Sequence, residues 1–157
     1  MPKHPEKYVG DIHKIVFRSS YELAAFNFID NQKDILKWSS EETIIPYTMG
    51  EGDRMRRYFV DLSILVRIDA NTTKKFLIEI KPYGKTIAPK KTTKTSDKTY
   101  NSSLAEWIQN SAKWAAAEKF CERNNATFIL WTERQIFPEF GKLAVKRIPR
   151  RKPPGKR

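Results

Sequence analysis

The sequence predicts a single α/β domain whose elements follow the order α-β-β-β-α-β, ahead of a basic C-terminal tail. Two segments have the apolar spacing of helices, and the segments between and after them have the pattern of strands. A length of 157 residues matches one domain of ordinary size, which can bury a core without disulfides. The chain is 39% hydrophobic and 12% aromatic, and this composition excludes wholesale disorder.

The first helix is expected to begin after Ser19 and to end at Asp30 and Asn31, because apolar residues recur at helical spacing between them. Ser19 and Glu22 also match the capping box, in which a Ser or Thr is followed three residues later by a Glu or Gln. This motif is a sufficient structural reason for an acid at position 22. Glu22 could equally be a third carboxylate that reaches a site on the sheet, and the residues alone leave both interpretations open.

Three strand-like segments follow, at residues 35–47, 58–68 and 75–81. Residues 49–57 are rich in glycine and charge, which is typical of a turn. Residues 69–73 have the sequence Asp-Ala-Asn-Thr-Thr, which is also turn chemistry, so the second and third segments should form a hairpin. Their apolar content predicts that both are central strands of a sheet rather than edge strands.

The second half of the domain begins with a polar stretch. Residues 83–102 are rich in Lys, Thr and Ser, and this composition predicts a mobile basic loop. A helix over residues 103–123 should follow, since Ser103 and Glu106 match a second capping box. The next strand is expected over residues 127–132. The expected apolar face of the helix consists of Leu104, Trp107, Ile108, Ser111, Ala115 and Ala116.

The C-terminal region is expected to hold one more short helical turn between residues 133 and 145, broken at Pro138 and Gly141. We therefore predict one domain over residues 1–145 and a basic tail over residues 146–157. From Lys142 to the end the chain has eight positive residues and no acidic one.

The charge balance indicates the class of partner. Thirty Lys and Arg residues against eighteen Asp and Glu residues give a net charge of +12 and a pI near 9.8. This excess favours a polyanionic partner, most often a nucleic acid. The one cysteine, Cys121, and the two histidines exclude a disulfide framework and an ordinary Cys/His zinc site, but they leave room for a hard cation bound by carboxylates. We expect no small-molecule cofactor.

The sequence contains no apolar run approaching the roughly 18–20 residues that would cross a bilayer. Its first ten residues are polar and charged, with no apolar core of a targeting segment. We therefore expect no contact with a membrane and a reducing compartment.

Two carboxylates interrupt the apolar strands of the predicted hairpin. Strand alternation places Val60 and Leu62 on the core face of the first strand. It places both acids, Asp61 and Glu79, on the opposite face of the hairpin. If the turn centres on Ala70, Asp61 lies directly opposite Glu79, with Cβ atoms roughly 4.5–5.5 Å apart. Two acids this close repel each other unless a cation lies between them or one is protonated.

This pair of acids predicts a site for Mg²⁺, which prefers carboxylate and carbonyl oxygens together with water. Lys81 follows Glu79 on the same face and could stabilise charge on a phosphate. The chemistry that results is metal-assisted hydrolysis of a phosphodiester. The alternative is that Asp61 and Glu79 are solvated acids on an outward face, and that Glu79 and Lys81 form a surface ion pair of little energy.

A contact to a phosphate needs only a positive side chain that can extend to it. The basic loop and the tail are therefore the best candidates for binding a nucleic-acid backbone. The alternative is that this charge serves only to keep the chain in solution. Polar residues on the second helix, Gln109 and Asn110 among them, are weaker candidates, since such residues are mostly solvated. The residues expected to bind DNA are Arg18, Lys85, Lys90, Lys91, Lys94, Lys113, Arg150, Arg151 and Lys152.

Several short motifs, taken in their order along the chain, carry a family resemblance through most of residues 15–133. They are Phe17-Arg-Ser-Ser-Tyr-Glu, Trp38-Ser-Ser-Glu-Glu, Ile45-Pro46-Tyr47, Tyr58-Phe-Val-Asp61, Leu77-Ile-Glu79-Ile-Lys81-Pro82, Gln109-Asn-Ser-Ala-Lys-Trp114 and Thr132-Glu133. In these motifs the chain resembles the head completion nucleases of T4-like bacteriophages. That family belongs to the PD-(D/E)XK nuclease superfamily, and its core is related to that of the TnsA-type transposon endonucleases.

The resemblance implies a restriction-endonuclease-like core with a central mixed sheet flanked by helices, and DNA cleavage that depends on Mg²⁺, for which Mn²⁺ can substitute. It implies that Asp61 is the signature Asp, Glu79 the acidic metal ligand and Lys81 the signature Lys. Glu22 would be the acidic residue that many members carry on a helix. Val60 departs from the superfamily pattern, which has a proline before the Asp.

The implied biological role is the processing of packaged phage DNA during head completion, before the tail joins. The protein would then act in the host cytoplasm during assembly, or in the head or neck of the virion, with portal or neck proteins as partners. A rival interpretation is a non-catalytic nucleic-acid-binding structural protein of the virion on a nuclease-like fold. A basic ribosome-associated protein would also explain the charge, but it gives no reason for Asp61 and Glu79 to interrupt apolar strands.

Overall fold

The fold is built on a four-stranded sheet, and the computed structural model describes residues 1–136. The strands lie in the order β1-β4-β5-β6, with the β5–β6 pair parallel and the other two pairs antiparallel. Their bounds are β1 Ile35–Ser40, β4 Leu62–Arg67, β5 Thr73–Ile80 and β6 Ala126–Trp131. The sheet is therefore mixed, as the resemblance implied, and β4 and β5 are its central strands, as their apolar content predicted.

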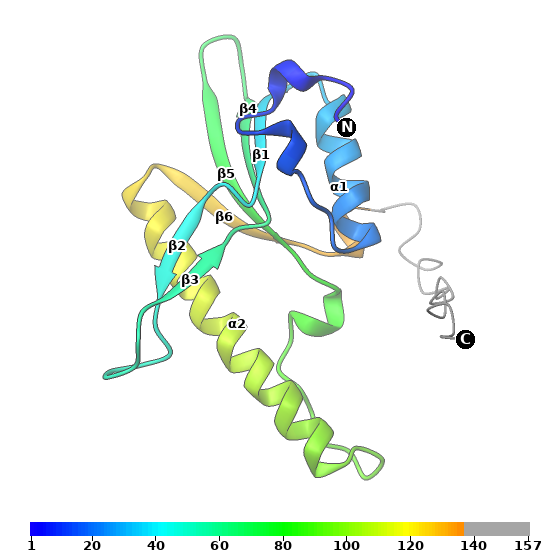
Figure 1. The fold of residues 1–157 in the computed structure, drawn as a ribbon, viewed down its shortest axis with the longest axis vertical. Helices are drawn as coiled ribbons and strands as arrows, with labels where there is room; N and C mark the ends of the chain where they lie inside the picture. Colours follow the sequence, from blue (N-terminus) through cyan, green and yellow to red (C-terminus); the bar gives the residue numbers. More distant parts are fainter. Residues whose placement is uncertain (137–157) are drawn as a thin grey trace, which may run out of the picture.

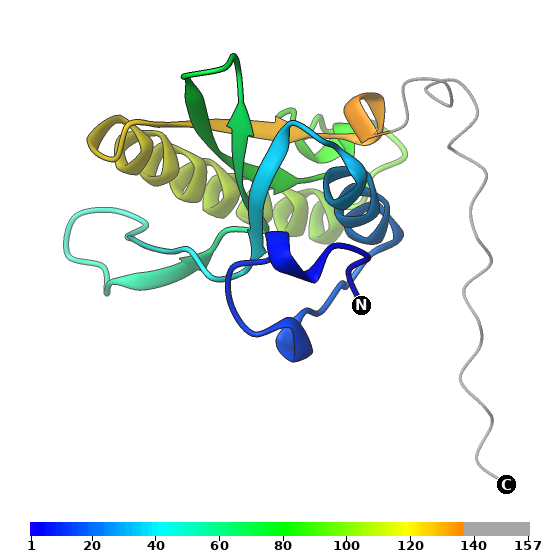
Figure 2. The same cartoon turned by 90° about the horizontal axis from the view of Figure 1, so that it is seen from above.

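A helix covers each face of this sheet (Figure 1). Helix α1 spans Ser20–Asn31 and helix α2 spans Asp97–Arg123. A second sheet of two strands, β2 Ile44–Tyr47 and β3 Arg56–Phe59, lies to one side, as the view in Figure 2 shows. Four short helical turns complete the described chain: η1 Pro5–Lys7, η2 Ile12–Lys14, η3 Tyr83–Lys85 and α3 Glu133–Ile136. No helix among residues 1–136 is long and apolar enough to cross a membrane.

Along the chain, the two long helices and the strands of the central sheet follow the order α1-β1-β4-β5-α2-β6, which is the predicted α-β-β-β-α-β. The prediction missed the side sheet because it treated residues 35–47 and 58–68 as continuous strands. The first segment turns at Glu41, which has a left-handed backbone with φ of 56°, and the second is interrupted at Val60 and Asp61. Both segments therefore pass from one sheet to the other.

Helix α1 begins where the sequence predicted. The Ser19 hydroxyl accepts a hydrogen bond from the Glu22 N–H at 3.1 Å, which satisfies one of the unpaired donors of the first turn. The Glu22 carboxylate accepts from the Arg18 N–H at 2.6 Å, one residue before the expected partner in a capping box. The capping interpretation of Glu22 is thus confirmed.

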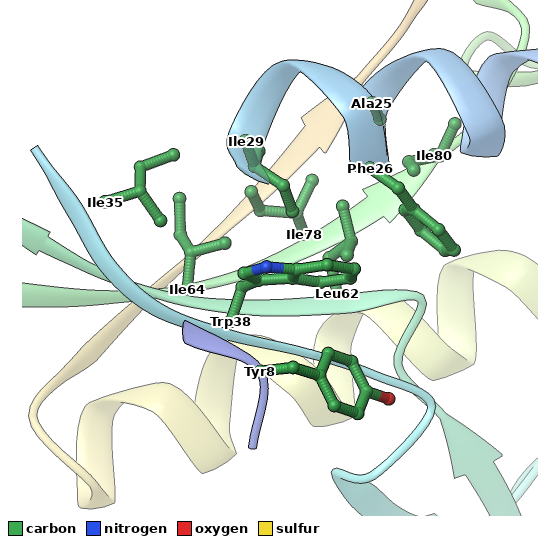
Figure 3. Close-up of a cluster of buried hydrophobic side chains, with 10 residues drawn as sticks. All are labelled: Tyr8, Ala25, Phe26, Ile29, Ile35, Trp38, Leu62, Ile64, Ile78 and Ile80. Atoms are coloured by element: carbon green, nitrogen blue, oxygen red, sulfur yellow. The ribbon is translucent and has the colours of Figure 1, made fainter. Parts of the chain in front are cut away.

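The larger hydrophobic core lies between α1 and the sheet (Figure 3). Trp38 of β1 is at its centre, between the α1 side chains and Tyr8 of the N-terminal segment. The indole N–H of Trp38 donates to the buried Asp30, which also accepts from the backbone N–H groups of Lys3 and His4. These bonds attach the N-terminal segment to the end of α1.

The second core lies on the opposite face, under α2. It joins Leu77 of β5 and Tyr58 of β3 to Ala117 and Cys121 of α2. Val60 belongs to this second core and not to the face of Leu62, so the predicted alternation across Val60 is wrong. The physical reason is the interruption at residues 60–61, which resets the two-residue period as the chain changes sheets.

The predicted register of the β4–β5 hairpin is confirmed. Leu62 lies opposite Ile78, and Arg67 lies opposite Thr73, so the turn centres on Ala70. The same register extended by one residue places Asp61 opposite Glu79.

Helix α2 begins at Asp97, six residues before the predicted start. Its N-cap is Ser96, whose hydroxyl accepts from the Thr99 N–H at 3.2 Å. Ser103 and Glu106 lie inside the helix, so the second capping box was a wrong interpretation. The extra turns extend beyond the sheet, as Figure 1 shows. They prolong a helix that packing in the second core already holds, and adding turns to a formed helix costs far less than starting one.

The early start of α2 shortens the predicted basic loop, which runs between regular elements only from residue 86 to residue 96. The buried positions of the helix are Asn110, Trp114, Ala117 and Cys121, whereas Ile108 and Ala115 of the predicted apolar face are exposed. In the C-terminal region α3 covers residues 133–136. Pro138, Gly141 and the tail over residues 146–157 lie outside the described residues.

Candidate active site

Glu79 is a buried acid whose two carboxylate oxygens both have partners. It lies near the end of β5, on the α2 side of the sheet with Leu77, and is 3% exposed. The Tyr58 hydroxyl donates to Oε2 at 2.6 Å, and the Lys81 ammonium lies 2.8 Å from Oε1. The interpretation of Glu79 as a solvated surface acid is therefore wrong, because α2 and the β2–β3 sheet cover the face that the hairpin alone would leave open.

Lys81 follows directly after β5 and is held in place by its backbone. Its N–H donates to the carbonyl of Trp131 at 2.9 Å, which continues the pairing with β6. Burial would favour the neutral amine, but the charge of Glu79 and the hydrogen bond to it outweigh burial and raise the pKa of Lys81. The side chain is therefore an ammonium at neutral pH, with 24% of its surface exposed toward solvent.

Asp61 sits at the interruption between β3 and β4. Its Oδ2 accepts a hydrogen bond from the Ile80 N–H at 2.7 Å, which directs the carboxylate toward the end of β5. Burial and the charge of Glu79 raise the pKa of Asp61 to about 7, although the Ile80 N–H and Lys81 act in the opposite direction. Asp61 and Glu79 are thus close enough to repel, as the register predicted.

Tyr58 is a residue of this site that the sequence analysis missed. It is 2% exposed, and burial followed by the charge of Glu79 raises its pKa far above the ordinary value, so the hydroxyl remains a donor. The Lys113 ammonium lies over the Tyr58 ring, 5.6 Å from its centroid. The available signal was a tyrosine three residues before Asp61, but a tyrosine in an apolar strand is usually a core residue.

The donor set of this site suits a hard divalent cation. Two carboxylates face one ammonium. Burial and the charge of Glu79 raise the pKa of Asp61, and a cation beside both acids would oppose these effects. Mg²⁺ keeps several of its waters and typically needs only one or two protein carboxylates together with substrate phosphates. No group of three or more His, Cys, Asp or Glu side chains placed to hold a metal occurs within residues 1–136.

Glu22 reaches the same region from α1 but does not complete a three-acid cluster. Its charge contributes to the raised pKa of Asp61. Its carboxylate faces a groove that Lys81, Lys85 and Glu106 also line. Because the carboxylate already accepts from the Arg18 N–H, its capping role and its place beside the site coexist.

Of the basic residues expected to bind DNA, Lys85 lines this groove, and three of the described ones have acidic partners. The guanidinium of Arg18 forms a two-pronged ion pair with Glu41, and Lys85 forms one with Glu106 at 2.6 Å. Lys91 pairs with Asp97 at 2.5 Å. Lys90 and Lys94 are exposed in the loop over residues 86–96. Arg150, Arg151 and Lys152 lie outside the described residues.

Asp61 should make the stability of the metal-free protein depend on pH. Its pKa is about 7 in the folded chain against an ordinary value of 3.8, so between these values the folded chain holds more protons than the unfolded chain. The contribution of Asp61 protonation to the free energy of unfolding is therefore fully present below about pH 4 and is lost as the pH rises to 7. Between these two pH values, the free energy of unfolding of the wild type should fall by on the order of 3–4 kcal/mol more than that of Asp61→Asn. The variant has no carboxyl group at position 61 to titrate.

Urea unfolding in EDTA between about pH 4 and pH 7.5 measures this difference. The Asn side chain still accepts from the Ile80 N–H, so the variant changes the titration with little change in shape. Parallel stability curves for the two proteins would show that Asp61 has an ordinary carboxyl pKa.

The sequence of the domain matches a family model over the residues that form this site. Residues 32–133 match the model described as TnsA-like endonuclease N terminal. The chain belongs to the TnsA-like endonuclease family. The match includes Asp61, Glu79 and Lys81, whereas Glu22 precedes it. The mixed sheet with a helix on each face fits the restriction-endonuclease-like fold that the resemblance implied.

A curated relative supports the same assignment. The chain is 33% identical over 136 residues to the protein named Head completion nuclease from Enterobacteria phage T4. The alignment covers 85% of this chain and 88% of that protein. No solved structure matches the chain.

Proposed function

We propose that this TnsA-like protein is a divalent-cation-dependent nuclease that hydrolyses phosphodiester bonds of DNA. The observation that carries the proposal is the meeting of Asp61, Glu79 and Lys81 at the ends of two paired central strands. The endonuclease family, the net charge of +12 and a close pair of acids beside one ammonium all favour the same chemistry.

Asp61 and Glu79 would hold Mg²⁺ or Mn²⁺, and Glu22 would contribute from the groove through water. When bound, the cation would polarise a phosphate oxygen and lower the pKa of a bound water. The Tyr58 hydroxyl and the Lys81 ammonium keep the Glu79 carboxylate in one orientation. Lys81, partly exposed beside Glu79, would stabilise the negative charge that develops on the phosphate.

The reaction is a hydrolysis. The oxygen of a water molecule bonds to phosphorus, one ester P–O bond breaks, and a proton of the water ends on the departing sugar oxygen. The two acids and the lysine lie at one end of the β4–β5 pair, so the scissile phosphate would be placed at that end, above the groove lined by Lys81 and Lys85.

The DNA backbone would be held by basic residues, of which Lys85 lines this groove. In the described part of the chain these are Arg18, Lys85, Lys90, Lys91, Lys94 and Lys113, and Arg150, Arg151 and Lys152 would add to them. Contacts of this kind neutralise phosphates and release counterions, so the affinity should fall steeply with salt concentration.

The biological step follows from the name of the T4 relative. We propose that the chain processes packaged phage DNA during head completion, before the tail joins. It would act in the host cytoplasm during assembly or in the head or neck of the virion, where portal or neck proteins are the candidate partners.

A second candidate is a structural protein of the virion that binds DNA without cutting it. The observation that favours it is that both oxygens of Glu79 already have protein partners and that residues 1–136 contain no group of three or more His, Cys, Asp or Glu side chains placed to hold a metal. This candidate predicts no response to divalent cations.

We expect Mg²⁺ and Mn²⁺ both to activate DNA cleavage and to stabilise the fold, because a cation relieves the repulsion between Asp61 and Glu79. At a cation concentration of 100 times the dissociation constant, the stabilisation is about 2.7 kcal/mol, or roughly 5–10 °C in melting temperature for a domain of this size. Asp61→Asn should remove most of this shift. Thermal melts with and without the cation measure the shift. Cleavage assays of linear DNA, stopped with EDTA, measure the activation.

Equal melting temperatures in EDTA and in millimolar Mg²⁺ or Mn²⁺, together with intact DNA, would favour the structural protein. A shift of the same size in wild type and Asp61→Asn would place the cation elsewhere.

A further inference from the structure

A polar cavity lies beside the proposed active site, between α2 and the chain that follows β5. Its volume of about 170 Å³ holds several waters rather than the single water of an ordinary buried site. The chain on one side is anchored, because the Tyr83 N–H donates to the Glu133 carboxylate at 2.9 Å. The cavity is lined by Gly84, Lys85, Ile87, Pro89, Ser103, Glu106, Trp107 and Asn110.

The walls of this cavity combine apolar surface with one amide that has no protein partner within residues 1–136. Trp107, Ile87 and Pro89 offer an aromatic ring and aliphatic faces. Asn110 is only 5% exposed, and among the described residues its side-chain amide has no hydrogen-bond partner. Because both amide groups are free in the described chain, a ligand with complementary donors and acceptors could pair with them.

The cavity and the groove of the proposed active site share a boundary. Lys85 and Glu106 line both, and their ion pair at 2.6 Å stands between them. Both side chains are nearly half exposed, so the pair can separate when a phosphate competes for Lys85. A nucleotide whose phosphate lies in the groove would have its base within reach of the cavity.

We propose that this cavity receives an unpaired nucleobase of the DNA strand in the groove. Nucleobases have flat apolar faces and polar edges, and proteins bind displaced bases by stacking on aromatic or apolar side chains and by hydrogen bonds to the edge. Trp107 would stack on the base, and Asn110, whose carboxamide offers a donor and an acceptor, would bond its edge.

This inference rests on the proposed function, since it assumes DNA in the groove. It adds a substrate class: DNA with unpaired nucleotides next to the cleaved bond, such as single-stranded ends, gaps or flaps. Fully paired duplex keeps its bases stacked inside the helix, so it would leave the cavity empty and bind less tightly.

The test compares the binding of a single-stranded oligonucleotide and of the fully paired duplex with the same sequence, in EDTA so that no strand is cut. Stacking by one aromatic side chain contributes about 1–3 kcal/mol, so Trp107→Ala should bind the single strand about 5- to 150-fold more weakly. Asn110→Ala should weaken it as well, and both variants should bind the duplex within about twofold of wild type. Ile108→Ala, which changes the exposed neighbour on α2, is the matched control.

A fluorescent base analogue gives a second measurement. 2-Aminopurine in the single strand should be quenched on binding to wild type and less quenched on binding to Trp107→Leu, which keeps an apolar side chain without the ring. This readout also serves if Asn110→Ala does not fold. Wild-type affinity and quenching in the Trp107 variants, or an equal loss of affinity for both DNA forms, would overturn the proposal.

The two proposals can fail separately because this assay involves no cleavage. If cleavage occurs but the Trp107 and Asn110 variants bind like wild type, the nucleobase site is wrong and the nuclease stands. If single-strand preference depends on Trp107 but no cation produces cleavage, the nuclease is wrong and the binding site stands.

Discussion

Asp61→Asn and Glu79→Gln should each reduce DNA cleavage by at least about 1,000-fold while leaving DNA affinity within about threefold of wild type. A bound cation contributes several kcal/mol to the transition state of phosphodiester hydrolysis, and roughly 4 kcal/mol corresponds to this factor. Both substitutions keep the shape of the side chain and remove one negative charge. Affinity is maintained because the basic residues that contact phosphates are unchanged.

Asp69→Asn is the matched control, because Asp69 is an acid in the turn of the same hairpin and lies away from the site. It should cleave like wild type. The assays are single-turnover cleavage of labelled DNA in Mg²⁺ and gel-shift titration in EDTA. Cleavage by either site variant at near the wild-type rate would remove that acid from the catalytic machinery.

Lys81→Met should lower both activity and stability, because it leaves the buried Glu79 carboxylate without its ammonium partner. Breaking a buried ion pair from one side typically costs about 3–5 kcal/mol, and the partial exposure of Lys81 reduces this to about 2–3 kcal/mol. For a domain of this size the melting temperature should fall by roughly 5–10 °C. Cleavage should fall by at least about 100-fold, as is typical when one group that stabilises developing charge is removed.

The double variant Glu79→Gln/Lys81→Met separates the two effects. It removes both charges, so it should recover most of the lost stability and none of the lost cleavage. Lys74→Met, on the exposed part of the same strand, is the control for loss of a lysine and should change neither property greatly. If the double variant is destabilised by the sum of the Glu79→Gln and Lys81→Met effects, the Glu79–Lys81 pair contributes no coupling energy.

The hairpin that carries the candidate site could be predicted because its signals are local. Turn residues over 69–73 set its centre, and the two-residue period of the flanking strands excludes a slip by one residue. The register then places Asp61 opposite Glu79 with no knowledge of the rest of the fold. The start of α1 was predictable for the same reason, since Ser19 and Glu22 make their capping bonds within one turn.

The start of α2 was not predictable from its apolar pattern. The spacing of apolar residues marks where a helix is buried, and α2 begins at Asp97, before its buried face does. The N-cap at Ser96 was one of several Ser and Thr residues in a polar stretch, and local composition alone did not distinguish it. The cavity beside Trp107 exists because the chain after β5 folds back onto this extended helix.

By itself, the sequence determined which acids are neighbours, because pairing across a tight hairpin depends on turn residues and alternation within about ten residues. Only the tertiary structure decided what surrounds them. The chain leaves the central sheet at Val60 and Asp61, and the side sheet then brings Tyr58 over Glu79 from a strand that does not pair with β5. Burial depends on which layers pack together, and packing between distant segments leaves no local periodicity to detect. For this reason Glu79 looks in sequence like an acid on an open face, and in the fold it is a covered carboxylate held by a tyrosine and a lysine.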